Sequence, residues 1–103
     1  MKKKFRLYNK HVSGPVIPRF GLDTSFRALR LGTRLAETVV HNEESAGQVF
    51  ALRMARREYG KRASVRAFKE DGVAGENGKI FVVWLQDASG RLGKEERFAV
   101  MAS

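Results

Sequence analysis

The run RMARREYGKR, residues 53–62, crowds cationic side chains around one carboxylate, Glu58. Most of these cations are arginines, whose planar guanidinium can pair with a phosphate or a carboxylate through two parallel hydrogen bonds. The chemistry that this spacing favours is therefore the binding of an anion. The candidate binding residues of this part of the chain are Arg53, Arg56, Arg57, Lys61, Arg62 and Arg66.

A second concentration of positive charge lies in residues 1–35, where nine Lys or Arg residues stand against one acidic residue. Within it, KFRLYNK at residues 4–10 alternates as a strand does, with Phe5 and Leu7 on one face and a basic, solvent-facing side opposite. The first four residues precede this alternation and are expected to be dispensable for folding. The candidate binding residues here are Lys2, Lys3, Lys4, Arg6, Tyr8 and Lys10.

The chain has no sequence signature of an enzyme. The GxSxG, HExxH, Walker A and GxGxxG patterns are all missing, and the protein has no cysteine. His11 and His41 lie far apart, and the acidic pair Glu43 and Glu44 is explained by its favourable place at the start of a helix. We therefore expect no catalytic residue, no metal site and no cofactor.

Length and composition favour one small domain. A chain of 103 residues with 43% hydrophobic content forms a single core, so residues 1–103 are interpreted as one domain with a basic N-terminal segment at 1–35. The longest apolar run, at residues 80–85, is far shorter than the roughly 20 residues of a membrane span. MKKK is not followed by the apolar stretch of a signal peptide. We expect a protein of the cytoplasm that makes no membrane contact.

The arginines at 53, 56 and 57 belong to a predicted helix over residues 45–59. Ser45 followed by Gln48 matches a capping box, and Gly60 suits the position just after a helix. At about 100° per residue, the apolar side chains form one arc and the three arginines the opposite one. Such a stripe is either an anion-binding surface or a solvated helix face near the favourable end of the helix dipole.

The rest of the chain reads as strands and turns. Alternation and β-branched content predict strands at 4–10, 33–41, 63–69, 79–86 and 95–101. The two prolines of 13–21 indicate a loop, and glycine-rich turns are expected at 71–78 and 87–93. Residues 22–32 favour a turn of helix, with a strand as the alternative. The predicted fold is α+β: one main helix packed on a mainly antiparallel sheet of four to five strands.

The charge pattern predicts a small nucleic-acid-binding module that contacts phosphates through the N-terminal segment and the arginine stripe. Two basic segments can combine into one positive surface, and Tyr8 or Phe68 would be available to stack on bases, while Trp84 is expected in the core. No zinc-finger, RNP, KH or leucine-zipper pattern is apparent, so base-specific contacts are not predicted. The sequence does not distinguish DNA from RNA, and the oligomeric state stays open.

The alternative is an inhibitor or adaptor that docks its basic surface on an acidic protein or on a nucleoprotein complex. The order strand, helix, strand, strand over residues 33–101 resembles that of small phage and mobile-element proteins, some anti-CRISPR proteins among them. This resemblance implies a protein partner and assigns no role to any residue. Binding to naked DNA or RNA distinguishes the two functions.

Overall fold

The structure is a computed structural model that describes residues 1–9, 27–31, 33–74 and 78–102. Lys10 and the loop predicted at 13–21 lie outside these residues. The elements are β1 (Lys3–Asn9), β2 (Arg27–Ala28), β3 (Arg30–Leu31), β4 (Arg34–Leu35), β5 (Glu37–Val40), α1 (Glu43–Tyr59), β6 (Ser64–Val73), β7 (Gly78–Gln86) and β8 (Leu92–Ala102).

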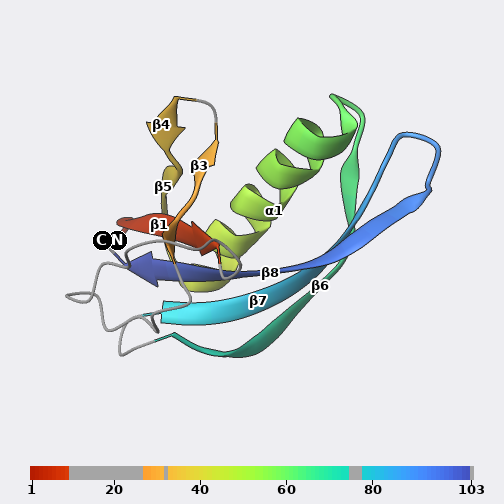
Figure 1. The fold of residues 1–103 in the computed structure, drawn as a ribbon. Helices are drawn as coiled ribbons and strands as arrows, with labels where there is room; N and C mark the ends of the chain where they lie inside the picture. Colours follow the sequence, from red (N-terminus) through yellow and green to blue (C-terminus); the bar gives the residue numbers. More distant parts are fainter. Residues whose placement is uncertain (10–26, 32, 75–77, 103) are drawn as a thin grey trace.

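The described domain consists of a curved six-stranded sheet with one helix on its concave face and a small two-stranded sheet, β3–β4 (Figure 1). The strand order is β2-β1-β8-β7-β6, and β5 also pairs with β1, on the edge that β2 uses. All described pairings are antiparallel. The predicted α+β class, with one helix on a mainly antiparallel sheet, is confirmed. β7, which carries apolar side chains on both faces, lies inside the sheet, between β6 and β8.

The helix begins two residues earlier than the sequence pattern predicted. Asn42, not Ser45, is the N-cap, because its side chain accepts a hydrogen bond of 2.8 Å from the Ser45 backbone N–H. The predicted end is confirmed: Gly60 has φ of 98°, a conformation that favours glycine, and its N–H donates to the Arg56 carbonyl at 3.0 Å. The first turn of the helix therefore includes two acidic residues, Glu43 and Glu44, that the predicted range left outside it.

The main core lies between α1 and the sheet. Phe5 and Leu7 of β1, Phe50 of α1 and Phe81 and Phe98 of the central strands are its largest members, and each is at most 1% exposed. Burial of such side chains stabilises the fold by about 1.5–3 kcal/mol each. The predicted orientation of Phe5 and Leu7 toward the core is confirmed.

Three predicted connections differ from the structure, and one of them, the turn predicted at 87–93, ends early because β8 begins at Leu92. The described part of the segment predicted as a turn of helix, residues 27–31, is extended and contributes β2 and β3, so the alternative of a strand is correct there. The turn predicted to begin at residue 71 starts later, because β6 continues to Val73. Gly72 has φ of 145°, a conformation that favours glycine. It lies where the pairing of β6 with β7 shifts register, between Glu70 and Gly72.

Candidate nucleic-acid interface

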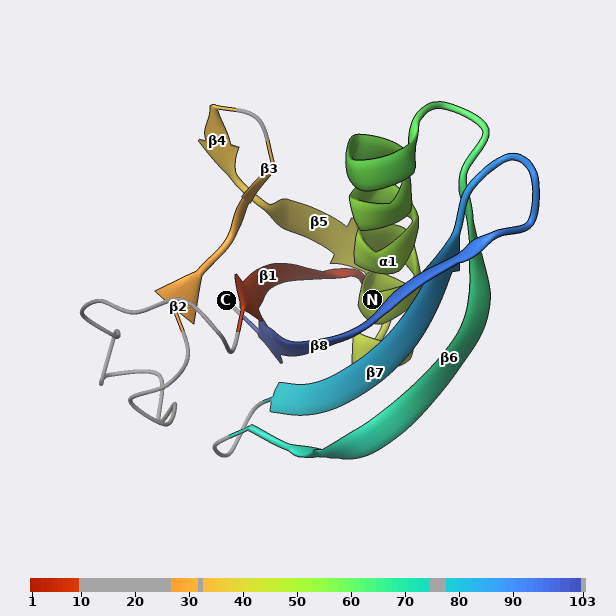
Figure 2. The ribbon, with the colours of Figure 1, turned by 45° about the vertical axis from the view of Figure 1, so that its right-hand side comes forward.

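A hairpin, β3–β4, is inserted into the edge strand that pairs with β1. Leu29 donates to the Leu7 carbonyl at 3.0 Å, and Leu7 donates to the Ala36 carbonyl at 3.2 Å, so residues on both sides of the insertion continue the pairing. A hydrogen bond of 3.0 Å from Ala36 N–H to the Leu29 carbonyl closes the base of the hairpin. The hairpin consequently projects away from the sheet and stands beside α1 (Figures 1 and 2).

One helix arginine, Arg57, holds the hairpin itself, and a second, Arg53, holds the start of β5 directly after it. Arg57 Nη1 donates to the Arg30 carbonyl at 2.7 Å, and Arg53 Nη1 donates to the Glu37 carbonyl at 3.0 Å. The Arg53 guanidinium also lies 5.8 Å from the centroid of the Phe50 ring. All three arginines are exposed, as the helix pattern predicted, but Arg53 and Arg57 are neither fully solvated nor available solely for an external anion.

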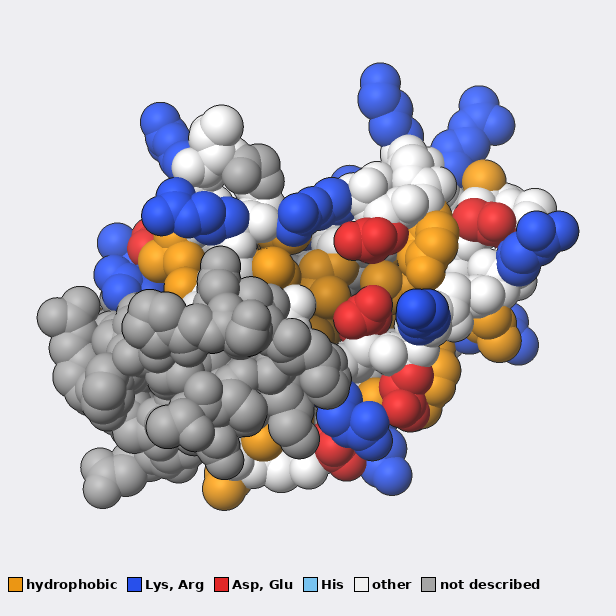
Figure 3. Space-filling model, viewed as in Figure 1, with side chains coloured by type: hydrophobic (Ala, Val, Ile, Leu, Met, Phe, Trp, Pro, Cys, Tyr) orange, Lys and Arg blue, Asp and Glu red, His pale blue; other side chains and the backbone are white. Residues whose placement is uncertain are grey.

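The remaining cations of this region point to solvent. Arg34, Arg56, Lys61 and Arg62 are exposed and make no hydrogen bond or ion pair within the part of the chain that the structure describes. Figure 3 shows Lys and Arg side chains along the upper edge of the molecule, over the hairpin and the end of α1. We define the hairpin–helix surface as Arg30, Arg34, Arg53, Arg56, Arg57, Lys61 and Arg62.

The hairpin arginines were absent from the candidate set drawn from the sequence. Arg30 and Arg34 flank Gly32 and Thr33 in RLGTRL, where two apolar–basic pairs surround a turn signal. That pattern indicates a short hairpin with arginines on it. Its position beside α1 depends on contacts between residues 16 and 27 positions apart, which no local pattern reveals.

The N-terminal cations are on a different face of the sheet. Phe5 and Leu7 face the helix, so the alternating Lys4 and Arg6 face away from it. There they approach the Glu37 carboxylate, at 3.7 Å and 3.3 Å respectively. Lys2 and Lys3 are exposed. The structure therefore does not bring Lys4 and Arg6 together with the helix arginines into one surface.

Tyr8 corrects the expectation of a solvent-facing aromatic. It is 0% exposed and packs in a second apolar cluster with Ala74, Ala99 and Met101, on the face away from α1. The alternation of β1 does place Tyr8 opposite Leu7, but this part of the second face is also buried. Tyr8 has no exposed ring on which a base can stack.

The other two aromatic candidates differ from expectation in opposite ways. Phe68 is half-buried, and its ring stacks on that of Phe81 with centroids 4.7 Å apart, so it serves the helix–sheet packing. Trp84 was expected in the core, yet it is only partly buried and belongs to neither core cluster. It lies on the face of β7 opposite Phe81 and Val83, which face the helix.

Of the two remaining candidates, Arg66 lies away from the hairpin–helix surface, and Lys10 lies outside the residues that the structure describes. Arg66 is exposed on β6, the edge strand, at an irregularity between Val65 and Ala67 where pairing with β7 shifts register. Lys10 falls among the residues that are not described.

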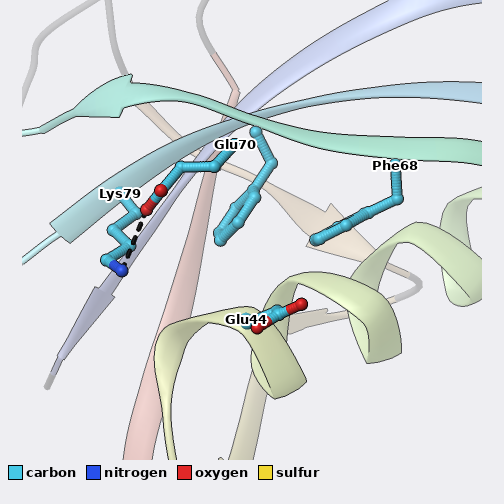
Figure 4. Close-up of a pocket in the computed structure, with 5 residues that line it drawn as sticks. Glu44, Phe68, Glu70 and Lys79 are labelled. Carbon is cyan, nitrogen blue, oxygen red and sulfur yellow. Dashed lines mark ion pairs between the residues drawn. The ribbon is translucent and has the colours of Figure 1, made fainter.

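A small pocket, about 170 Å³, lies at the other end of α1 (Figure 4). It is lined by Phe68 and Phe81 and by the charged side chains Glu44, Glu70 and Lys79. Lys79 Nζ is 2.9 Å from Glu70 Oε1, and this hydrogen bond, with the negative charge of Glu70, raises the pKa of Lys79 above its usual range. Glu44 and Arg56 are about 18 Å apart along the helix, so the pocket is separate from the hairpin–helix surface.

Within the described ranges, no group of three or more His, Cys, Asp or Glu side chains is arranged to hold a metal ion. The helix that the structure describes is too short and too polar to cross a membrane. Comparisons with protein-family models, curated proteins and solved structures found no significant match to this chain.

Proposed function

We propose that this protein binds nucleic acid through its hairpin–helix surface, by contacts to phosphates. The observation that carries the proposal is the hydrogen bond from Arg57 to the Arg30 carbonyl, which joins a basic hairpin to the basic end of a helix 27 residues later. Cations that are separate in the sequence thereby become neighbours in space. Among residues 53–62, at the end of the helix, the acidic residue is Glu58.

The energetics of such a cluster favour an anionic partner. Arginines three and four residues apart on a helix repel each other by a few tenths of a kcal/mol per pair. The place of Arg56 and Arg57 in the last turn partly offsets this repulsion through the helix dipole. A row of phosphates removes the remaining repulsion and releases condensed counterions. Arg34, Arg56 and Arg62 are exposed. The planar guanidinium group of each side chain suits phosphate oxygens well.

The expected binding is strong at low salt and depends little on base sequence. If five cations each neutralise one phosphate of a duplex, the logarithm of affinity falls with the logarithm of salt with a slope of about −4.5. This corresponds to a loss of about 500-fold between roughly 50 and 200 mM salt. Fluorescence anisotropy with labelled DNA and RNA over this range measures both quantities.

A charge-matched pair of variants locates the surface. Arg34→Ala/Arg56→Ala/Arg62→Ala should reduce the slope by up to about 2.7, whereas Lys2→Ala/Lys3→Ala/Lys69→Ala, which removes three exposed cations away from the end of α1 at Tyr59, should change it much less. Equal effects of the two variants would refute this surface. No binding to any nucleic acid at low salt would refute the function and favour an acidic protein partner.

A further inference from the structure

The β3–β4 hairpin is too small to fix its own orientation. Its strands pair at only two positions, Arg30 with Leu35 and Leu31 with Arg34. An isolated two-stranded hairpin is at best marginally stable in water. The position of the hairpin must therefore come from its attachments to the rest of the domain.

Those attachments are of two kinds. Leu29 and Leu31 pack against the core, and Ala36 is 3% exposed, which anchors the base. Arg57 and Arg53 then donate from α1 to a carbonyl before the turn and a carbonyl after it. Hydrogen bonds from a charged donor are stronger than neutral ones. Here one helix face holds the first leg of the hairpin, at Arg30, and the start of β5 directly after the hairpin, at Glu37.

We propose that the β3–β4 hairpin is a ribbon that enters a groove of duplex nucleic acid, and that Arg53 and Arg57 are positioning residues that hold it for this contact. The proposal rests on the proposed function. Two observations support it: the hairpin projects beside the basic end of α1 (Figure 2), and Arg34 on it is exposed. The major groove of B-form DNA admits a two-stranded β-ribbon, while the helix end can meet phosphates at the groove's rim.

The two arginine pairs then have different roles. Removal of Arg56 and Arg62 takes away charge, which weakens binding to duplex and to single strands alike. Removal of Arg53 and Arg57 takes away the same charge and also frees the hairpin, which weakens binding to duplex more than to single strands. A groove is present only in the duplex, so the ratio of the two affinities reports the position of the hairpin.

The experiment compares Arg53→Ala/Arg57→Ala with Arg56→Ala/Arg62→Ala in the full chain, using a 20-base-pair DNA duplex and one of its strands as probes. We expect the unchanged protein to prefer the duplex by about tenfold, a preference worth about 1.4 kcal/mol. The first variant should lose that preference and the second should keep it. Hydrogen exchange in the free protein should show the Ala36 amide less protected in the first variant alone.

Equal exchange at Ala36 in the two variants, or an equal loss of duplex preference, would overturn the inference. If the double variant does not fold, Arg57→Ala alone, which retains the Arg53 hydrogen bond, should show the same changes at smaller size. If the unchanged protein binds neither probe, the proposed function and groove entry both fail. Faster exchange at Ala36 would in that case still assign Arg53 and Arg57 to holding the hairpin.

Discussion

Gly47 of α1 lies directly against the ring of Phe68 in β6. A β-carbon at position 47 would stand 2.8 Å from Phe68 Cζ and 3.0 Å from two ring carbons of Phe81. The two rings are stacked, so neither moves without the other being affected. The absence of a side chain at Gly47 thus permits the close approach of helix and sheet beside the pocket.

Gly47→Ala is expected to lower the free energy of unfolding by about 1 kcal/mol. Overpacking a core costs about 1–3 kcal/mol, and alanine in place of glycine in a helix returns about 1 kcal/mol. Urea unfolding measures the net change. The double variant Gly47→Ala/Phe68→Leu, which shortens the opposing side chain, should recover part of the loss. A gain of about 1 kcal/mol in the single variant would show that the rings yield freely.

Replacement of the buried Tyr8 should be costly. Truncation of a buried aromatic to alanine typically destabilises a protein by about 3–5 kcal/mol, and we expect Tyr8→Ala to fall in this range. Val39→Ala, at a side chain that is 52% exposed, provides the control and should cost less than about 1 kcal/mol. Thermal and urea unfolding give both values. Similar stabilities of the two variants would contradict the burial of Tyr8.

The N-terminal truncation expected to be neutral from the sequence is now expected to depend on its length. Lys3 and Lys4 are the first residues of β1 and pair with Val40 and Val39 of β5. Deletion of residues 1–2 should leave the melting temperature unchanged. Deletion of residues 1–4 removes hydrogen bonds worth about 1 kcal/mol each, and each kcal/mol should lower the melting temperature by roughly 4–8 °C. Equal melting temperatures would show that these pairs are frayed.

Acid should loosen the turn between β7 and β8. The Ser89 hydroxyl donates to Asp87 Oδ1 at 2.6 Å, and the backbone N–H groups of Arg91 and Ser89 donate to the same oxygen at 3.0 and 2.9 Å. These hydrogen bonds hold the pKa of the Asp87 carboxyl below its usual range. Because the pKa of Asp87 is lower in the folded protein than in the unfolded chain, the ionised carboxyl stabilises the fold at any pH above the unfolded-state pKa. This stabilisation is lost as the pH falls through the folded-state pKa.

Asp87→Asn tests this because asparagine keeps an acceptor oxygen and has no titratable charge. We expect the variant to be less stable than the unchanged protein at pH 7, and the difference to shrink as pH falls below about 4, the ordinary range of an aspartate. Melting temperatures of both proteins from pH 7 to pH 2.5 measure the difference. A gap that stays constant over this range would rule out titration of Asp87 as its source.

The sequence by itself determined the elements whose signals are local. The Ser45–Gln48 pattern, the apolar period and the Gly60 stop located this helix to within two residues at its start, although the N-cap is Asn42. The alternation around Phe5 and Leu7 identified the face of β1 that meets the helix, because one period-2 pattern suffices to mark a buried side. The exposure of the helix arginines followed from the same geometry.

Only the tertiary structure decided what covers each face and which distant groups meet. Alternation separates Tyr8 from Leu7 but does not say whether the second face is also buried, as it is around Tyr8. The partner of Arg57 is a backbone carbonyl, which every residue possesses, so no residue type 27 positions earlier marks it. The same backbone path places Lys4 and Arg6 away from α1. The sequence shows how many cations a segment contains, but they form one basic surface only when the fold brings them to the same side of the molecule.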